Sequence, residues 1–257
     1  MKFGICVGDK ASSVAIAAKS GFDFVESCFS LLAEAPDEKY NAFAAALKES
    51  GIPCLSVNCF MPGRLKVTGP EIDTEAVTAY VKKGMERGKA LGVKKVVFGS
   101  SGARNIPEGF SYREGYRQII AFLQNIVSPI AAENGITVVI EPLGREDSNI
   151  INCAQEAAAV AAAVGKDNVH TLVDLYHMTT DVNDSPDTVR KLKGEIFHAH
   201  IACPVSRVFP TDPAAYDYKA FVDALVYAGC ETCAVEGRSD DFTADAPVAA
   251  AVLKSLL

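Results

Sequence analysis

The sequence has no long apolar run and no block of basic residues, and these absences narrow the functions it could perform. A membrane-spanning helix needs roughly 18 to 20 apolar residues in succession, whereas the Ala-rich run at 157–164 is far shorter. Lys and Arg total 25 against 32 Asp and Glu, which gives a formal net charge of −7. A chain this acidic is a poor ligand for a phosphate backbone. We therefore expect neither a membrane nor a nucleic acid as its main partner.

A secretion signal and a nucleotide-binding motif are missing as well. The first ten residues contain too short an apolar run for a signal peptide, and charge interrupts it. The eight cysteines are scattered along the chain, which is typical of reduced thiols, so we expect a cytoplasmic protein. No GxGxxG motif follows the first apolar run, and this removes the main argument for a dinucleotide-binding fold.

Short Val- and Ile-rich runs alternate with helical segments along the whole chain. Runs of this length and composition are typical of parallel strands that are buried on both faces. The strands are expected at 3–7, 22–26, 53–58, 94–98, 136–141, 169–174, 196–201 and 231–236. The helices are expected at 10–20, 36–50, 72–91, 112–134, 153–164, 184–193, 214–229 and 243–256.

This alternation predicts a parallel sheet with helical crossovers, either open and doubly wound or closed into a barrel. Eight units of about 32 residues in a chain of 257 favour a closed (β/α)8 TIM barrel. No linker or shift in composition divides the chain, so residues 1–257 are expected to form one domain. The loops after strands are long, whereas the turns from helices back to strands are short. In a barrel these long loops form the face that binds ligands.

Four of the predicted strands end in an ionisable residue. These residues are Glu141, Asp174, His200 and Glu236. Because neighbouring barrel strands end side by side, the four side chains should meet at one point. Three carboxylates at that distance repel one another unless a divalent cation lies between them. Three oxygen ligands and one nitrogen suit Mn²⁺ or Mg²⁺, and also Co²⁺, better than a structural zinc.

The segments around these four residues resemble the xylose-isomerase-like barrel superfamily, within it the ketose 3-epimerase and sugar phosphate isomerase/epimerase group. The resemblance covers the whole chain and is carried by Glu141-Pro142-Leu143, Asp174-Leu175-Tyr176-His177, His198-Ala199-His200 and Glu236. It implies that the four strand-end residues hold one divalent metal ion. Mn²⁺ is favoured, with Mg²⁺, Co²⁺ or Zn²⁺ as alternatives.

The resemblance also implies a reaction on a small-molecule carbohydrate, namely a sugar, a ketose or a related polyol. Glu141 and Glu236 would act as the acid/base pair, and His177 would bind substrate oxygens near the carbonyl. The metal would stabilise the enediolate formed when a proton leaves the carbon next to the carbonyl. Return of the proton to the opposite face gives epimerisation, and return to the neighbouring carbon gives isomerisation.

Further residues are expected to contact the substrate. Epimerases of this group have an arginine six residues after the metal-binding histidine, where this chain has Ser206. Arg207 follows it and could take that role after a shift of one residue in the loop. Asp147 stands where the group has a second glutamate. Glu26, at the end of the second predicted strand, and Arg104, in a polar loop, are additional candidates.

Three other functions remain open. A lyase or dehydratase of the same superfamily would expel a leaving group from the enediolate. A non-catalytic sugar-binding barrel would keep the metal without turnover. The zinc endonuclease branch needs many histidines from the first half of the chain, whereas all four histidines here lie at or beyond residue 170. A homo-oligomer is also possible, with Phe60 and Phe209 expected as exposed contact residues.

Overall fold

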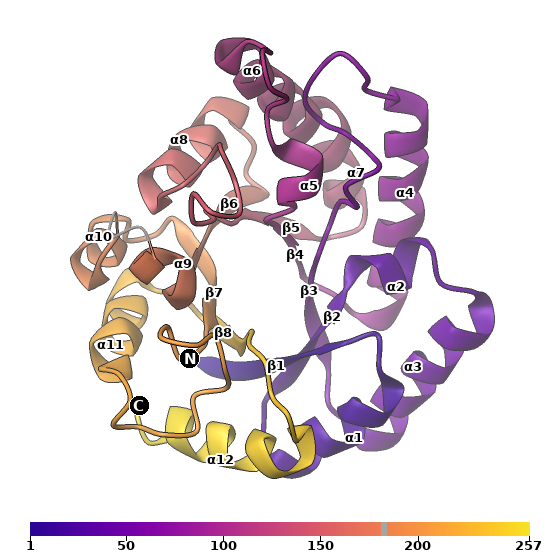
Figure 1. Cartoon of the computed structure of the whole chain (residues 1–257). Coiled ribbons are helices and arrows are strands. Elements are labelled where there is room, and N and C mark those ends of the chain that lie inside the picture. The colour runs from indigo at the N-terminus through magenta and orange to yellow at the C-terminus, as the bar shows by residue number, and fades with distance from the viewer. Residues whose placement is uncertain (181–183) are drawn as a thin grey trace.

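The computed structural model describes residues 1–180 and 184–257, and within them eight parallel strands close into a barrel (Figure 1). The strands are β1 (Lys2–Gly8), β2 (Phe24–Cys28), β3 (Cys54–Asn58), β4 (Lys95–Phe98), β5 (Thr137–Ile140), β6 (Val169–Asp174), β7 (Ile196–Ile201) and β8 (Thr232–Val235). Each strand pairs with its neighbours in the sequence, and β1 closes the barrel against β8. The predicted single-domain (β/α)8 TIM barrel is confirmed.

Helices surround the barrel on the outside (Figure 1). At the predicted positions lie α1 (Ala11–Ser20), α3 (Asp37–Ser50), α4 (Thr74–Leu91), α6 (Tyr112–Phe122), α7 (Ser128–Glu133), α8 (Ala154–Val164), α10 (Pro186–Lys191), α11 (Tyr218–Ala228) and α12 (Phe242–Lys254). The helix expected at 112–134 is interrupted between α6 and α7 by a π-helical turn, η1 (Leu123–Val127). Pro129, whose nitrogen has no hydrogen to donate, lies two residues after the end of this turn.

Three short helices were not predicted: α2 (Phe29–Ala33), α5 (Ser101–Arg104) and α9 (Leu175–Thr180). All three directly follow a strand or its first loop residues, on the face where ligands are expected to bind. The last of them occupies most of the loop predicted at 175–183, of which residues 181–183 lie outside the described part of the chain. Short helices of this kind fix the orientation of side chains, whereas the sequence pattern shows only that these residues lie in loops.

The apolar core lies between the strands and the surrounding helices. Phe60 and Phe209, which were expected on the surface, belong to this core and are 0% and 4% exposed. The expectation that they mediate an oligomer contact is therefore wrong, because their rings are already covered within the chain. Within residues 1–180 and 184–257, none of the helices combines the length and the apolar character that a bilayer span requires.

The barrel interior is polar along one side and apolar along the other. Val97, Val139 and Leu172 form an apolar cluster apart from the main core. Leu172 pairs in register with His198, and paired residues of neighbouring strands point to the same face. The interior therefore contains a buried imidazole beside aliphatic side chains.

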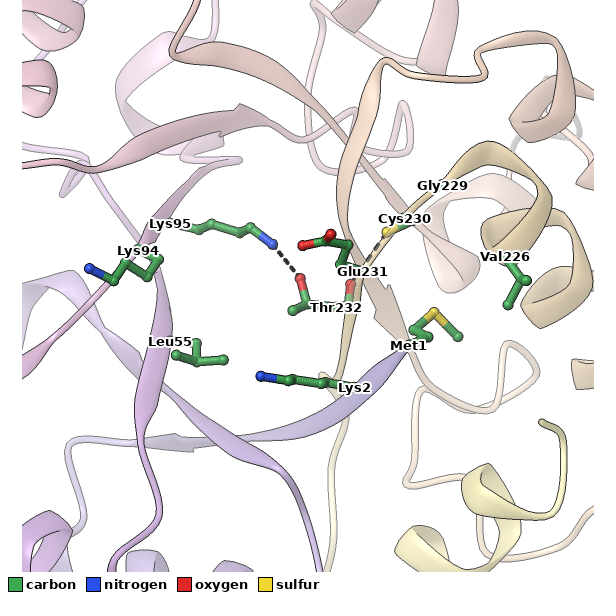
Figure 2. A pocket seen from close by; sticks show the side chains of 10 residues that line it. All are labelled: Met1, Lys2, Leu55, Lys94, Lys95, Val226, Gly229, Cys230, Glu231 and Thr232. Atoms are coloured by element: carbon green, nitrogen blue, oxygen red, sulfur yellow. Dashed lines mark hydrogen bonds between the residues drawn. The ribbon is translucent and has the colours of Figure 1, made fainter.

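The two ends of the barrel each have a cavity. At the end where the strands begin, a cavity of about 680 Å³ is lined by Lys2, Lys94, Lys95 and Thr232, among others (Figure 2). Lys95 extends into the barrel there, and its Nζ donates a hydrogen bond to Oγ1 of Thr232 at 2.6 Å. The cavity at the opposite end, where the strands finish, is lined by some of the predicted functional residues.

Candidate active site

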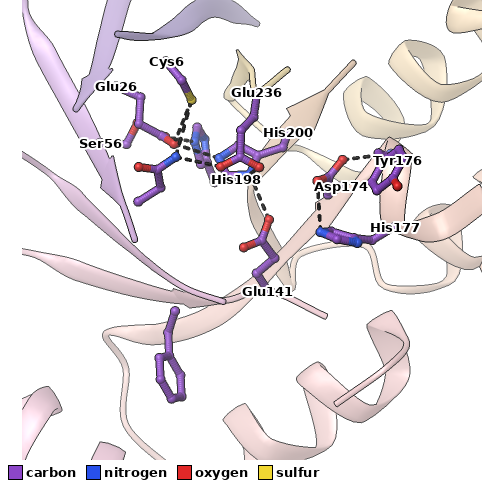
Figure 3. A network of polar contacts seen from close by, with 12 residues as sticks. Cys6, Glu26, Ser56, Glu141, Asp174, Tyr176, His177, His198, His200 and Glu236 are labelled. Carbon is purple, nitrogen blue, oxygen red and sulfur yellow. Dashed lines mark hydrogen bonds and ion pairs between the residues drawn. The ribbon is translucent and has the colours of Figure 1, made fainter. Parts of the chain in front are cut away.

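The four residues predicted to bind a metal come together where successive strands end (Figure 3). They are Glu141 directly after β5, Asp174 at the end of β6, His200 in β7 and Glu236 directly after β8. Parallel pairing places Asp174 beside His200. One potential ligand atom from each of the four lies within 4.8 Å of the other three. Sequence pattern and structure thus place the same four side chains at one point.

A divalent cation fits this group because one buried carboxylate oxygen accepts no hydrogen bond from the described residues. Oδ1 of Asp174 accepts a hydrogen bond from the backbone N–H of Tyr176 at 2.8 Å. Its Oδ2 is buried and has no hydrogen-bond partner among the residues described. Nδ1 of His200 lies 2.9 Å from Glu141 and 3.3 Å from Glu236. A cation among these groups would balance charges that are costly to bury.

The carboxyl groups of this site differ in their affinity for protons. Burial, together with the charges of Glu236 and Glu141, raises the pKa of Asp174 to about 7. Burial also raises the pKa of Glu141 above its ordinary value. Burial opposes ionisation of Glu236 as well, but His200 outweighs it and lowers the pKa of Glu236 to about 2. Groups with pKa values driven apart in this way are typical of acid/base chemistry.

A second group of potential ligands overlaps with the first and suits a metal less well. Cys6, Glu26, His200 and Glu236 also have ligand atoms within 4.8 Å of one another. However, burial, followed by the charges of Glu26 and Glu236, raises the pKa of the Cys6 thiol well above its ordinary value. The protonated thiol donates to Oε1 of Glu26 at 3.3 Å. A thiol that keeps its proton is a poor metal ligand.

Glu26 does not lie where it was predicted. The second strand was expected to end at residue 26, but β2 continues to Cys28, so Glu26 lies one interior layer below the rim. It is 0% exposed, and its carboxylate oxygens lie 2.8 Å from His198 Nε2 and 2.9 Å from His200 Nε2. The residue does not line the cavity above the site. It contacts His200 from below, so the expected substrate contact is replaced by a contact with a metal-ligand candidate.

Arg104 is also placed differently from the prediction. It was expected in a polar loop facing a ligand, but it ends the short helix α5 and is 0% exposed. Its Nη1 donates to the carbonyl oxygen of Phe98 at 2.8 Å, and Nη2 donates to that of Ile151 at 3.4 Å. Arg104 does not line the cavity. It connects backbone segments beneath the site, and the expected substrate contact is corrected.

His177 lines the cavity in an orientation fixed by its neighbours. The backbone N–H of Gly144 donates to its Nδ1 at 3.2 Å. Burial lowers the pKa of His177 to about 3, and the charge of Arg207 adds to this effect. The ring is therefore neutral. Its Nε2 lies 3.4 Å from Nη2 of Arg207 and 3.7 Å from Oδ2 of Asp174. Asp147 lines the same cavity, with Oδ2 3.7 Å from Nδ1 of His177.

Arg207 reaches the centre of the site, as the shifted-loop interpretation required. Its Nη2 lies 3.1 Å from Oε2 of Glu236 and 3.8 Å from Oδ2 of Asp174. The guanidinium stacks over the ring of Tyr176, 4.6 Å from its centre. The backbone has a φ of +52°, a conformation that L-residues rarely adopt. Ser206, at the position where the resemblance implies an arginine, is exposed.

The cavity at this end has a volume of about 310 Å³ and includes residues outside the predicted set of site residues. Besides the predicted side chains, it is lined by Cys59, Met61, Leu143 and the segment 99–102. Asn58, at the end of β3, donates to Oε1 of Glu236 at 2.7 Å and so fixes that carboxylate. Cys59, Met61 and Leu143 lie in loops directly after strands, which is the signal that could have identified them.

Comparison with known proteins agrees with this geometry. Residues 14–256 match the family described as Xylose isomerase-like TIM barrel. The D-psicose 3-epimerase of Agrobacterium fabrum is 26% identical over 193 residues, which cover 71% of this chain and 64% of the relative. The chain therefore aligns with slightly less than two thirds of that relative's length.

Solved structures show the same fold. The D-allulose 3-epimerase of Methylomonas sp. in complex with D-allulose superimposes with a TM-score of 0.84 at 19% identity, over 100% of this chain and 97% of the other. The IOLI protein with a bound zinc atom gives a TM-score of 0.72 at 20% identity, over 100% and 96% of the two chains. From the match over residues 14–256, the chain belongs to the xylose isomerase-like TIM barrel family.

Proposed function

We propose that this protein is a divalent-metal-dependent epimerase or isomerase that acts on a sugar, a ketose or a related polyol. The observation that carries the proposal is the group formed by Glu141, Asp174, His200 and Glu236, whose ligand atoms lie within 4.8 Å of one another. The names of the relatives support the same class, since D-psicose 3-epimerase and D-allulose 3-epimerase both act on ketoses.

In this proposal the same four side chains hold the cation. Three carboxylates and one imidazole favour Mn²⁺, with Mg²⁺, Co²⁺ or Zn²⁺ as alternatives. When bound, the ion supplies a Lewis acid that stabilises the negative charge developing on the substrate as an enediolate forms. The structural neighbour with a bound zinc atom supports metal binding by a barrel of this fold.

Glu141 and Glu236 would move the proton. They come from β5 and β8, with the two strands β6 and β7 between them, so they approach the centre from different sides of the rim. Their pKa values are driven in opposite directions, with that of Glu141 raised and that of Glu236 lowered. One carboxyl group can therefore hold a proton while the other is ionised, as an acid/base pair requires.

His177 and Arg207 would bind the substrate oxygens. With Gly144 donating to Nδ1, Nε2 of His177 is the ring nitrogen that would contact a carbonyl or hydroxyl oxygen of the substrate. Arg207 offers donors beside Glu236 and would attract oxygen atoms that become negative in the reaction. Asp147, on the same wall of the cavity, would accept a hydrogen bond from a sugar hydroxyl.

The decisive experiment is exchange of the substrate hydrogen with solvent deuterium, followed by NMR on a panel of ketoses, keto acids and inososes with added Mn²⁺. Glu141→Gln and Glu236→Gln should each lower the exchange rate by about 100-fold or more, since general acid/base catalysis contributes this much. Glu146→Gln is the matched control, because Glu146 lies in the same loop as Asp147 but outside the cavity. Exchange at the wild-type rate in both site variants would refute the proposal.

The same NMR spectra separate the alternative functions. A lyase or dehydratase changes the composition of the substrate, whereas an epimerase or isomerase only rearranges it. Bound metal without exchange on any member of the panel would favour a non-catalytic sugar-binding barrel. The product, rather than the presence of a metal, therefore decides between these functions.

A further inference from the structure

A chain of hydrogen bonds runs through the barrel interior from the site toward the opposite cavity (Figures 2 and 3). Nε2 of His200 lies 2.9 Å from Oε1 of Glu26, and Oε2 of Glu26 lies 2.8 Å from Nε2 of His198. Nδ1 of His198 lies 2.8 Å from Oγ1 of Thr232, which accepts from Nζ of Lys95 at 2.6 Å. Glu26, His198 and His200 are each 0% exposed.

The groups at the two ends of this series of hydrogen bonds, Lys95 and Glu26, determine which atom donates and which accepts in each bond. Lys95 can only donate, so Oγ1 of Thr232 must accept a hydrogen bond from it. The hydroxyl group of Thr232 can then donate its own hydrogen bond to Nδ1 of His198. The carboxylate of Glu26 can only accept, so the hydrogen of His198 must be on Nε2. In a neutral ring with the hydrogen on Nε2, Nδ1 is the acceptor that the Thr232 hydroxyl needs.

Glu26 is saturated with donors in this arrangement. His198 and His200 donate from their rings, Ser56 donates from its hydroxyl group, and Cys6 donates from its thiol. An ionised carboxylate has about four acceptor positions, so these four donors fill it.

The last hydrogen bond of the chain determines the state of His200. Because Glu26 accepts at Nε2, that nitrogen carries a hydrogen, and Nδ1 faces Glu141 and Glu236. A histidine that ligates a metal through one nitrogen commonly donates from the other to a carboxylate, and loss of that carboxylate typically weakens metal binding by about 10- to 100-fold. Nδ1 is therefore the nitrogen available to a cation.

We propose that Glu26 is a positioning residue that fixes the ring of His200 with its hydrogen on Nε2 and its lone pair directed at the metal site. We further propose that Thr232 and Lys95, at the far end of the barrel, set the direction of the hydrogen bonds that hold Glu26 in this role. The proposal rests on the proposed function, because it assigns His200 as a metal ligand.

Mn²⁺ affinity, measured by titration calorimetry, tests the positioning role without any turnover. Glu26→Gln should weaken Mn²⁺ binding by about 10- to 100-fold. The NH₂ group of the new amide would face the hydrogen-bond donors that Glu26 now accepts from, so one of those hydrogen bonds would be lost. Thr232→Val, which keeps the shape of the side chain and removes the hydroxyl, should weaken it by at least about threefold. Thr232→Ser retains the hydroxyl and should bind as the wild type does. Circular dichroism and Tm establish that each variant is folded.

Two results would overturn the proposal. One is a folded Glu26→Gln or Thr232→Val protein with the wild-type Mn²⁺ affinity. If Glu26→Gln does not fold, the comparison of Thr232→Val with Thr232→Ser decides. The other is a ¹⁵N NMR spectrum that places the hydrogen of His198 on Nδ1, where it would donate to the backbone oxygen of Thr232 at 3.1 Å. His198→Asn assigns the signal.

The NMR measurement also separates failure of this proposal from failure of the proposed function. The expected state of His198 does not depend on a metal, so it can be read in protein without added ions. Wild-type protein that binds no Mn²⁺ would refute the metal site. The NMR spectrum alone would then decide the direction of the hydrogen bonds from Lys95 to Glu26. Normal Mn²⁺ binding that is insensitive to Glu26 and Thr232 would refute only the positioning role.

Discussion

A Cβ atom on Gly99 would lie 2.3 Å from Oε2 of Glu141, so the residue that follows β4 controls the position of a carboxylate that follows β5. No other residue type fits without moving this side chain, because contacts under 3.0 Å are essentially never seen for real Cβ atoms. The short distance explains why the rim of the barrel has a glycine at this point. It also connects a backbone position to the proposed metal site.

Gly99→Ala should therefore impair the site more than the fold. We expect Mn²⁺ affinity and the deuterium exchange rate to fall by about tenfold or more, because displacement of a ligand by about 1 Å is enough for such losses. Gly63→Ala is the control, since its Cβ would be 3.5 Å from the nearest atoms of Gly102, an ordinary contact. Equal activity of the two variants would show that Glu141 can move without consequence.

Metal affinity should depend on pH through Asp174. Burial and the neighbouring carboxylates raise the pKa of Asp174 to about 7, so below pH 7 a proton occupies the carboxyl group that the cation needs. The bound ion must displace this proton, so Asp174 alone should raise the Kd for Mn²⁺ by about tenfold for each pH unit below 7, in addition to the effect of the proton displaced from His200. Calorimetric titrations between pH 5.5 and 7.5 measure this slope.

Asp174→Asn provides the control for this pH dependence. The amide does not titrate, so the variant should bind Mn²⁺ more weakly and with a slope reduced by one proton. The remaining slope would come from His200, whose pKa the surrounding carboxylates raise well above its ordinary value despite burial. An Mn²⁺ affinity that stays constant from pH 5.5 to 7.5 in the wild type would contradict the assignment of Asp174.

The fold and the rim of the barrel could be predicted from the sequence because both depend on short-range patterns. Each apolar run that becomes a strand is about five residues long, and the first polar residue after it marks the end that faces ligands. This rule placed Glu141, Asp174 and Glu236 correctly, since β5, β6 and β8 end where the apolar runs end. It fails where a strand continues through polar residues.

Glu26 and Arg104 show what the pattern could not provide. The depth of Glu26 depends on the register Glu26↔Ser56 and on β2 continuing to Cys28, both of which are set by neighbouring strands. The burial of Arg104 depends on carbonyl groups of Phe98 and Ile151, which are distant from each other in the sequence. Contacts between distant segments decide these roles. Residue type alone is consistent both with a substrate contact in the cavity and with a buried contact beneath it.

Arg104 should matter for stability and little for substrate binding. Arg104→Met removes two charged hydrogen bonds to buried carbonyl oxygens, which should lower the free energy of unfolding by about 2 kcal/mol. The KM should stay close to the wild-type value because the guanidinium does not reach the cavity. Urea unfolding and steady-state kinetics test the two statements. Arg117→Gln, which removes an exposed ion pair with Glu114, should change stability by less than about 1 kcal/mol.

Arg207, in contrast to Arg104, should matter for activity and little for stability. Its guanidinium contacts Glu236 at 3.1 Å and lines the cavity, so Arg207→Met should reduce kcat/KM by about 10- to 100-fold, through loss of a charged hydrogen bond to substrate oxygens. Ser206→Ala is the matched control, because Ser206 is the adjacent residue and is exposed. A normal kcat/KM in Arg207→Met, or an equal loss in Ser206→Ala, would contradict the assignment. Since the backbone of Arg207 is left-handed, Arg207→Gly should be as inactive as Arg207→Met, because the defect lies in the missing guanidinium and not in the loop.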